Sequence, residues 1–204
     1  MKVKICGLHP VRDVQLCIDL NVNFLGFVFY SKSPRNVNLK EVEKLKSYKK
    51  LKSSFVAVTV NPSDEFIKDV ILENFDYIQL HGSETGDRVS EIKSLGIKTI
   101  KAIKIKGQSD IDNYKKYEHS DLILFDTPGM ELSLKFPENL ISKLPRGEKY
   151  ALAGSISQDN IENIAKLGVT FCDLSSSLEL DTQIGYKDHS KIEKFIKKVN
   201  ELKN

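Results

Sequence analysis

The sequence of 204 residues contains no tryptophan, three cysteines and a formal net charge of only +3. No apolar run approaches the roughly 20 residues that a membrane-spanning helix needs, so we expect no association with a membrane. An odd number of cysteines without paired spacing argues against a disulfide framework, and no apolar signal segment opens the chain. These two absences favour the reducing cytoplasm. The small net charge gives no basis for nucleic-acid binding.

Two kinds of motif are also missing. The four histidines have no ligand spacing such as His-x-His or His-Glu-x-x-His, so we expect no metal site. No Gly-x-Gly-x-x-Gly motif follows the first predicted strand, which argues against a dinucleotide-binding domain. The apolar content of 40% is ordinary for a globular protein with a sizeable core. We see no linker, and therefore predict a single domain that spans residues 1–204.

Short β-rich segments alternate with helical patterns along the chain. The predicted strands are 3–6, 24–29, 55–60, 77–80, 98–103, 122–125, 150–153 and 170–174. The predicted helices are near 10–20, 39–48, 62–74, 84–95, 110–116, 158–167 and 188–202. Units of about 25 residues in this α/β pattern predict parallel strands with right-handed crossovers, closed into a single (β/α)8 TIM barrel. An open doubly wound sheet is the alternative.

In a barrel the chemistry lies at the carboxyl ends of the strands, where this sequence places Cys6 and Asp126. The two-residue period of a strand puts Lys4 and Cys6 on one face, toward the barrel interior. A buried lysine needs a counter-ion, and Asp126 and Asp173 are the candidates. An ammonium beside a thiol also favours the thiolate. The alternative for Cys6 is that it is simply a small buried side chain.

Asp126 follows the apolar strand 122–125. Apolar walls favour the protonated carboxyl, which can act as a general acid; the alternative is a cap or an ion-pair partner of Lys4. A thiolate base together with a carboxylic acid suits the transfer of a proton between two atoms of one substrate. The other two cysteines, Cys17 and Cys172, lie within apolar runs and are expected to be core residues.

The loops after three of the strands suggest an anionic substrate. Gly154 and Ser155 precede a predicted helix, and Ser175 and Ser176 follow the last strand. Backbone N–H groups at such turns bind phosphate, and barrels often bind phosphate after strands seven and eight. The guanidinium of Arg35, in the polar loop after the second strand, suits a bidentate pair with a carboxylate. The plain alternatives are ordinary turn residues and a solvated loop arginine.

Eight short strings occur in order near the predicted strand ends. They are Lys4-Ile-Cys-Gly7, Gly26-Phe-Val-Phe29 with Ser33-Pro-Arg35, Val60-Asn61, Gln79-Leu-His-Gly82, Phe125-Asp-Thr127, Leu152-Ala-Gly154, Asp173-Leu-Ser-Ser176 and Gly185-x-Lys-Asp188. Together these strings resemble the phosphoribosylanthranilate isomerase family of tryptophan biosynthesis, and the resemblance covers nearly the whole chain.

The resemblance implies an Amadori rearrangement of N-(5-phosphoribosyl)anthranilate to 1-(2-carboxyphenylamino)-1-deoxyribulose 5-phosphate. It implies that Asp126 is the general acid on the ribose ring oxygen and that Cys6 is the base that removes the proton at C2. It places Arg35 near the anthranilate carboxylate. Further substrate-binding positions would be Gln79, His81 and Asp173, and the phosphate-binding positions would be Gly154, Ser155, Ser175 and Ser176. No metal or organic cofactor is implied, because the substrate nitrogen is the electron sink, and the enzyme would be a monomer or homodimer.

The chain departs from the family pattern at three loops. The segment 128–135 has one glycine where a Gly-Gly-Thr-Gly type loop is usual, Gly154-Ser155 replaces Gly-Gly, and Ser175-Ser-Ser177 replaces Ser-Ser-Gly. A serine preserves a glycine's backbone donor only where φ is negative, or at a cost in strain. Two other functions are therefore considered. One is a related sugar-phosphate isomerase such as the barrel enzyme of histidine biosynthesis, whose family has a carboxylate where Cys6 stands. The other is a phosphate-binding barrel that has lost catalysis.

Overall fold

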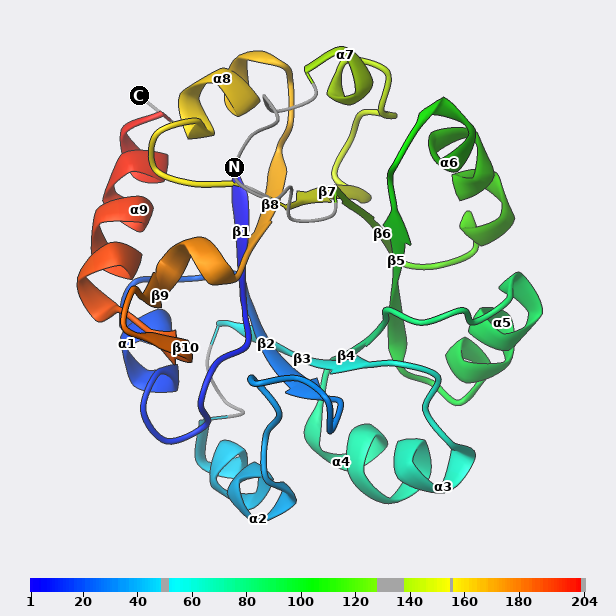
Figure 1. Ribbon diagram of the computed structural model, residues 1–204. Helices are drawn as coiled ribbons and strands as arrows, with labels where there is room; N and C mark the ends of the chain where they lie inside the picture. The colour runs from blue at the N-terminus through cyan, green and yellow to red at the C-terminus, as the bar shows by residue number, and fades with distance from the viewer. Residues whose placement is uncertain (49–51, 128–137, 155, 203–204) are drawn as a thin grey trace.

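The computed structural model describes residues 1–48, 52–127, 138–154 and 156–202, which include a closed barrel of parallel strands (Figure 1). In barrel order the strands are β1 (Lys2–Cys6), β2 (Phe24–Phe29), β3 (Ser54–Thr59), β4 (Tyr77–Leu80), β5 (Lys98–Lys104), β6 (Leu122–Asp126), β7 (Tyr150–Ala153) and β8 (Phe171–Leu174). Strand β8 pairs in parallel with β1, with Lys4 opposite Asp173, and this pairing closes the barrel. The prediction of a TIM barrel is confirmed, and the open sheet is wrong.

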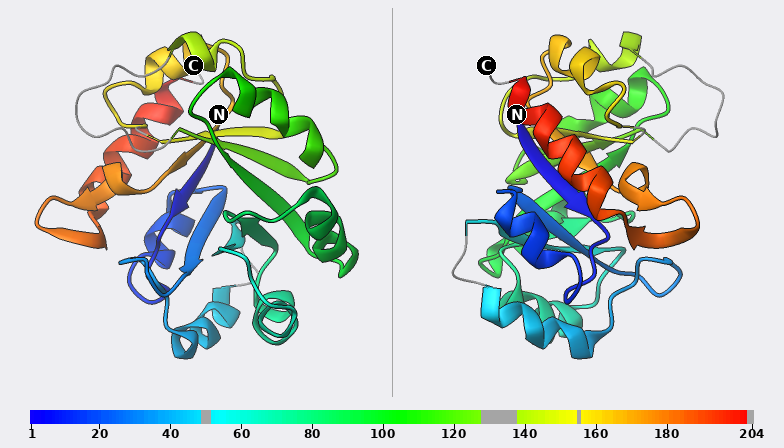
Figure 2. Two further views of the ribbon diagram at one scale, coloured as in Figure 1. Left: turned by 45° about the vertical axis from the view of Figure 1, so that its right-hand side comes forward. Right: turned by 90° about the vertical axis from the view of Figure 1, so that its left-hand side faces the viewer.

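Helical segments surround the strands on the outside of the barrel (Figures 1 and 2). They are α1 (Val14–Asp19), α2 (Leu39–Val42), η1 (Glu43–Tyr48), α3 (Asp64–Phe66), η2 (Ile67–Ile71), α4 (Leu72–Asn74), α5 (Gly86–Ser94), α6 (Gln108–Asp112), η3 (Asn113–Tyr117), α7 (Glu138–Ile141), α8 (Ile161–Lys166), η4 (Ser176–Leu178) and α9 (His189–Glu201). In the described part of the chain, none of these is long and apolar enough to cross a bilayer.

Alternate residues of each strand contribute to two different layers of the core. Val3 and Ile5 pack outward against the helices, whereas Lys4 is buried in the barrel interior, as the strand period predicts. The apolar side chains of the interior are Phe24, Val28, Val56, Val58, Ile100, Ala102, Leu122, Leu124, Ala151, Ala153 and Phe171. Cys17 and Cys172 are buried, which confirms that they are core residues.

A small antiparallel sheet lies outside the barrel and was not predicted. It consists of β9 (Glu179–Leu180) and β10 (Gln183–Lys187), between η4 and α9. A strand of two residues is too short to show the alternation by which strands are recognised in a sequence. The sheet nevertheless matters for the site, because it contributes two buried charged side chains, Glu179 and Lys187.

Candidate active site

A cavity of about 360 Å³ opens at the carboxyl ends of the barrel strands. Its walls include nine of the side chains or turns predicted from the sequence: Cys6, Arg35, Gln79, His81, Asp126, Gly154, Asp173, Ser175 and Ser176. Ser155 and the loop 128–135 lie outside the described residues. Cys6 ends β1 and Asp126 ends β6, on opposite sides of the barrel (Figure 1), so the two proposed proton-transfer groups border one space.

Lys4 is held beneath this cavity by Asp173. Its Nζ lies 2.8 Å from Asp173 Oδ2, and both side chains are buried. The predicted pairing of Lys4 is thereby confirmed, with Asp173 as the partner and not Asp126. Burial disfavours the charged amine, but Asp173 and Cys6 outweigh burial and raise the pKa of Lys4. Lys4 is therefore an ammonium group next to the proposed base.

Burial dominates the ionisation of Cys6. Desolvation raises the pKa of the thiol, and Lys4 and Lys187 offset only part of that effect. An adjacent ammonium was expected to favour the thiolate. Lys4 does lower the pKa of Cys6, but the net shift of that pKa is upward, so the expectation is wrong about the net shift. A further positive charge placed beside Cys6 would lower its pKa again and favour the thiolate.

Asp126, His81 and Gln79 are connected by side-chain contacts along the cavity wall. His81 Nε2 lies 3.1 Å from Asp126 Oδ2, and His81 Nδ1 lies 3.3 Å from the side-chain nitrogen of Gln79. The contact with His81 fixes one oxygen of Asp126, and no side chain among the described residues bonds the other. Two buried oxygens, Gln79 Oε1 and Asp173 Oδ1, have no hydrogen-bond partner among the described residues. Because buried acceptors normally receive a donor, these two oxygens have unused hydrogen-bonding capacity next to the cavity.

The turn after β7 requires a glycine. Gly154 has a φ of +92°, and a Cβ added there would overlap the Thr127 carbonyl oxygen. The turn after β8 is different, because Ser175 has a φ of −139° and donates its hydroxyl to the Cys6 carbonyl at 3.1 Å. Among the described residues other than glycine, only Asn21 and Asn61 have positive φ. The replacement of the usual glycine by Ser177 therefore causes no left-handed strain.

Gly154→Ala is expected to destabilise the protein more than the same change at Gly96. Both glycines have a φ of +92°, but no atom lies within 4 Å of a Cβ added at Gly96. Left-handed backbone strain alone costs Gly96→Ala about 1 kcal/mol, whereas overlap with Thr127 brings the cost at Gly154 to about 3 kcal/mol or more. Urea unfolding of the two variants measures the difference, and equal losses would show that the turn relaxes freely.

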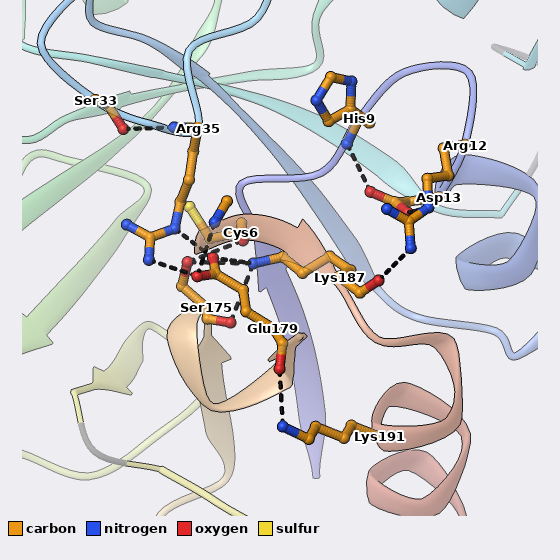
Figure 3. Close-up of polar contacts among 11 residues, drawn as sticks. Cys6, His9, Arg12, Asp13, Ser33, Arg35, Ser175, Glu179, Lys187 and Lys191 are labelled. Carbon is orange, nitrogen blue, oxygen red and sulfur yellow. Dashed lines mark hydrogen bonds and ion pairs between the residues drawn. The ribbon is translucent and has the colours of Figure 1, made fainter. Parts of the chain in front are cut away.

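Arg35 is not the solvated loop arginine of the alternative interpretation. Its side chain is 23% exposed, and Glu179 holds it in a bidentate ion pair, with Nε at 2.5 Å from Oε1 and Nη2 at 3.0 Å from Oε2 (Figure 3). Lys187 Nζ lies 3.1 Å from Glu179 Oε1 and 3.0 Å from the Ser175 carbonyl oxygen. Burial opposes the Glu179 carboxylate, but Arg35, Lys187 and the Gly185 amide outweigh it and lower the pKa of Glu179 to about 2.

Glu179 and Lys187 are not among the site residues predicted from the sequence. The string Gly185-x-Lys-Asp188 was a signal for Lys187, but it says nothing about a partner. Glu179 is 144 residues from Arg35 in the chain, and no local pattern reports such a pair. The described residues contain no group of three or more His, Cys, Asp or Glu side chains arranged to hold a metal ion.

Comparison with known proteins gives consistent matches over nearly the whole chain. The family model for N-(5'-phosphoribosyl)anthranilate (PRA) isomerase matches residues 3–198. The N-(5'-phosphoribosyl)anthranilate isomerase of Rhizobium rhizogenes is 33% identical over 210 residues, covering 98% of this chain and 94% of the relative. That of Staphylococcus haemolyticus is also 33% identical and covers 98% of both chains.

Solved structures agree with the sequence matches. Phosphoribosyl anthranilate isomerase from Thermotoga maritima is 27% identical with a TM-score of 0.83, covering 98% of this chain and 99% of that chain. A phosphoribosyl anthranilate isomerase in complex with reduced 1-(o-carboxyphenylamino)-1-deoxyribulose 5-phosphate is 26% identical with a TM-score of 0.82, at the same coverage. The likeness in fold therefore extends over nearly the whole chain.

Proposed function

The chain belongs to the N-(5'-phosphoribosyl)anthranilate isomerase family of tryptophan biosynthesis, and from this premise we propose which of its residues carry out the reaction. As an isomerase of this family it acts on N-(5'-phosphoribosyl)anthranilate, the first of the three functions considered from the sequence. The observation that carries the proposal is that Cys6 and Asp126 border one cavity, which Arg35 and the turns after β7 and β8 also line.

Asp126 is the general acid in this proposal. Its carboxyl group protonates the ribose ring oxygen, the bond between that oxygen and C1 breaks, and the substrate nitrogen supplies the electrons, giving a cationic imine. The contact between His81 and Asp126 orients the carboxyl group, so that its second oxygen faces the ligand. No cofactor is needed, since the nitrogen of the substrate accepts the electron pair in the following step.

Cys6 is the general base. It removes the proton from C2, the electrons neutralise the imine, and the resulting enolamine tautomerises to the ketone. Burial holds the pKa of Cys6 above its ordinary value, which disfavours the thiolate. The cationic imine lowers the free energy of a thiolate beside it. The substrate thus provides, after ring opening, the positive charge that makes Cys6 a competent base.

The two ends of the substrate are bound by different kinds of group. Arg35 binds the anthranilate carboxylate through its guanidinium. The ribose hydroxyls meet Gln79, His81 and Asp173, two of which have a buried oxygen without a partner among the described residues. The phosphate lies at the turns after β7 and β8. Its oxygens accept hydrogen bonds from the backbone N–H groups of Gly154, Ser155, Ser175 and Ser176.

Protection from alkylation tests this arrangement. We expect iodoacetamide at pH 9 to modify Cys6, which lines the cavity, and not Cys17 or Cys172, which are buried. Saturating reduced 1-(o-carboxyphenylamino)-1-deoxyribulose 5-phosphate should slow modification of Cys6 at least tenfold, as measured by peptide mass spectrometry. Modification of Cys6 at an unchanged rate with the ligand bound would contradict the placement of the substrate next to the thiol.

A further inference from the structure

Glu179 is a buried carboxylate that the reaction itself does not use. It lies on β9, outside the barrel, and its side chain reaches the guanidinium of Arg35 (Figure 3). We propose that Glu179, held in place by Lys187, is a positioning residue that aims one edge of the Arg35 guanidinium into the cavity and thereby selects substrates that carry a ring carboxylate. The inference rests on the proposed role of Arg35.

The geometry of the guanidinium supports this role. A guanidinium has two edges suited to bidentate pairing, the Nε–Nη2 edge and the Nη1–Nη2 edge at its tip. Glu179 occupies the first edge with both of its oxygens. Among the described residues no hydrogen bond engages the tip edge as a pair, so this edge can bind a second carboxylate, and Arg35 lines the cavity. The ion pair with Glu179 therefore does not compete with a substrate carboxylate for the same hydrogen-bond donors, and it fixes the direction in which those donors point.

Glu179 is itself rigidly held. Its Oε2 accepts a hydrogen bond from the Gly185 amide at 3.1 Å, and its carbonyl oxygen accepts one from Lys191 Nζ at 2.8 Å. Lys187 is fully buried and joins Glu179 Oε1 to the carbonyl oxygen of Ser175. The same network thus connects the proposed carboxylate end of the site to the proposed phosphate turn after β8.

Two glycines allow the loop of Arg35 to lie close to this network. A Cβ added at Gly185 would lie 2.6 Å from the Pro34 carbonyl oxygen, and one added at Gly7 would lie 2.5 Å from Arg35 Cδ. The arginine stem therefore runs between the end of β1 and the β9–β10 sheet with little free space. Its remaining freedom is the rotation of the guanidinium, and Glu179 is the group that restricts this rotation.

The balance of charge also fits the recognition of an anion. Arg35 and Lys187 supply two positive charges and Glu179 supplies one negative charge, so the group keeps a net charge of +1, and of the three it is Arg35 that lines the cavity. Without the Glu179 carboxylate the two cations would repel each other, and Arg35 would turn toward solvent. A purely structural ion pair would hold the sheet to the barrel but would not discriminate between ligands.

Binding of two ligands distinguishes the two roles. The first is reduced 1-(o-carboxyphenylamino)-1-deoxyribulose 5-phosphate, and the second is the same compound without the ring carboxylate. We expect Glu179→Gln to raise the Kd of the first about tenfold and to change the Kd of the second by less than about twofold, because the second ligand has no carboxylate for Arg35 to bind. In turnover, KM should rise about tenfold with kcat within about threefold of the wild type, the pattern of lost uniform binding.

Matched variants make the result specific. Asp181→Asn removes an exposed acid from the same hairpin, one that pairs only with Lys191 among the ion pairs described, and it should leave both Kd values unchanged. Arg35→Ala should abolish the preference for the carboxylated ligand. Adding Glu179→Gln to Arg35→Ala should cause no further loss, because Glu179 acts through Arg35.

The outcomes distinguish the proposed role of Glu179 from the proposed role of Arg35, on which it rests. If Arg35→Ala keeps the preference for the carboxylated ligand, the proposed role of Arg35 is wrong. If Arg35→Ala loses that preference while Glu179→Gln keeps it, the role of Arg35 stands and the inference about Glu179 is overturned. Should Glu179→Gln fail to fold, Glu179→Asp serves as the test. It keeps the negative charge but moves it away from Arg35 by the length of one methylene group. A preference for the carboxylated ligand equal to that of the wild type would then overturn the inference.

Discussion

Cys6→Ser is expected to lower kcat by about three orders of magnitude, in the range that removal of a general base produces. A serine hydroxyl occupies the same position but does not ionise near neutral pH, so it cannot take the proton from C2. The Kd of the reduced product analogue should stay within about threefold of the wild type, since none of the proposed ligand contacts is lost. Steady-state fluorescence kinetics and calorimetric titration measure the two quantities.

Cys17→Ala is the matched control for Cys6→Ser. Cys17 is a fully buried residue of α1, where burial raises the pKa of its thiol to about 12. Its replacement should lower the free energy of unfolding by about 1 kcal/mol and leave kcat within about twofold. A Cys6→Ser variant that retains more than a tenth of the wild-type kcat would show that the thiol is not the base.

Asp126→Asn is expected to lower kcat by a similar factor of about 10³, for a different reason. An amide preserves the shape of the side chain and can still form a hydrogen bond with His81, but it cannot donate a proton to the ring oxygen as an acid. The reaction should therefore stop before ring opening, whereas Cys6→Ser stops it afterwards. Rapid-quench analysis of substrate with deuterium at C2 distinguishes these two cases.

The isotope effect provides the decisive comparison. In Cys6→Ser the C2 proton transfer is rate-limiting, so deuterium should slow turnover severalfold, whereas in Asp126→Asn ring opening is limiting and deuterium should have little effect. Asp87→Asn, which changes an exposed aspartate of α5, serves as the control and should match the wild type. A full isotope effect in Asp126→Asn would remove this residue from the acid role.

The barrel was predictable from the sequence because buried parallel strands appear in a sequence as short runs of apolar residues. The predicted bounds of β2, β4 and β7 agree with the structure, and the ends of the other barrel strands differ by one residue. The sequence therefore predicts that residues at the strand ends surround one opening, since the fold itself gathers the carboxyl ends of all its strands.

Two features were beyond reach of the sequence, because both depend on distances across the fold. Burial and the Asp173 carboxylate raise the pKa of Cys6 against the charges of Lys4 and Lys187, and the strand period placed only Lys4 beside the thiol. The pairing of Arg35 with Glu179 depends on a short hairpin whose register has no apolar pattern. Periodicity predicts which face a side chain occupies, but it does not predict which distant charge it meets.

Closure of the barrel through β1 and β8 also has a consequence for the synthesis of the protein. Lys4 leaves the ribosome near the beginning of translation, and its partner Asp173 follows 169 residues later. At ordinary elongation rates this interval lasts roughly ten to thirty seconds. During that time one edge of β1 has no neighbouring strand and Lys4 has no counter-ion. The first strand of the nascent chain, which carries Cys6, can therefore take its final place only after the last barrel strand has been made.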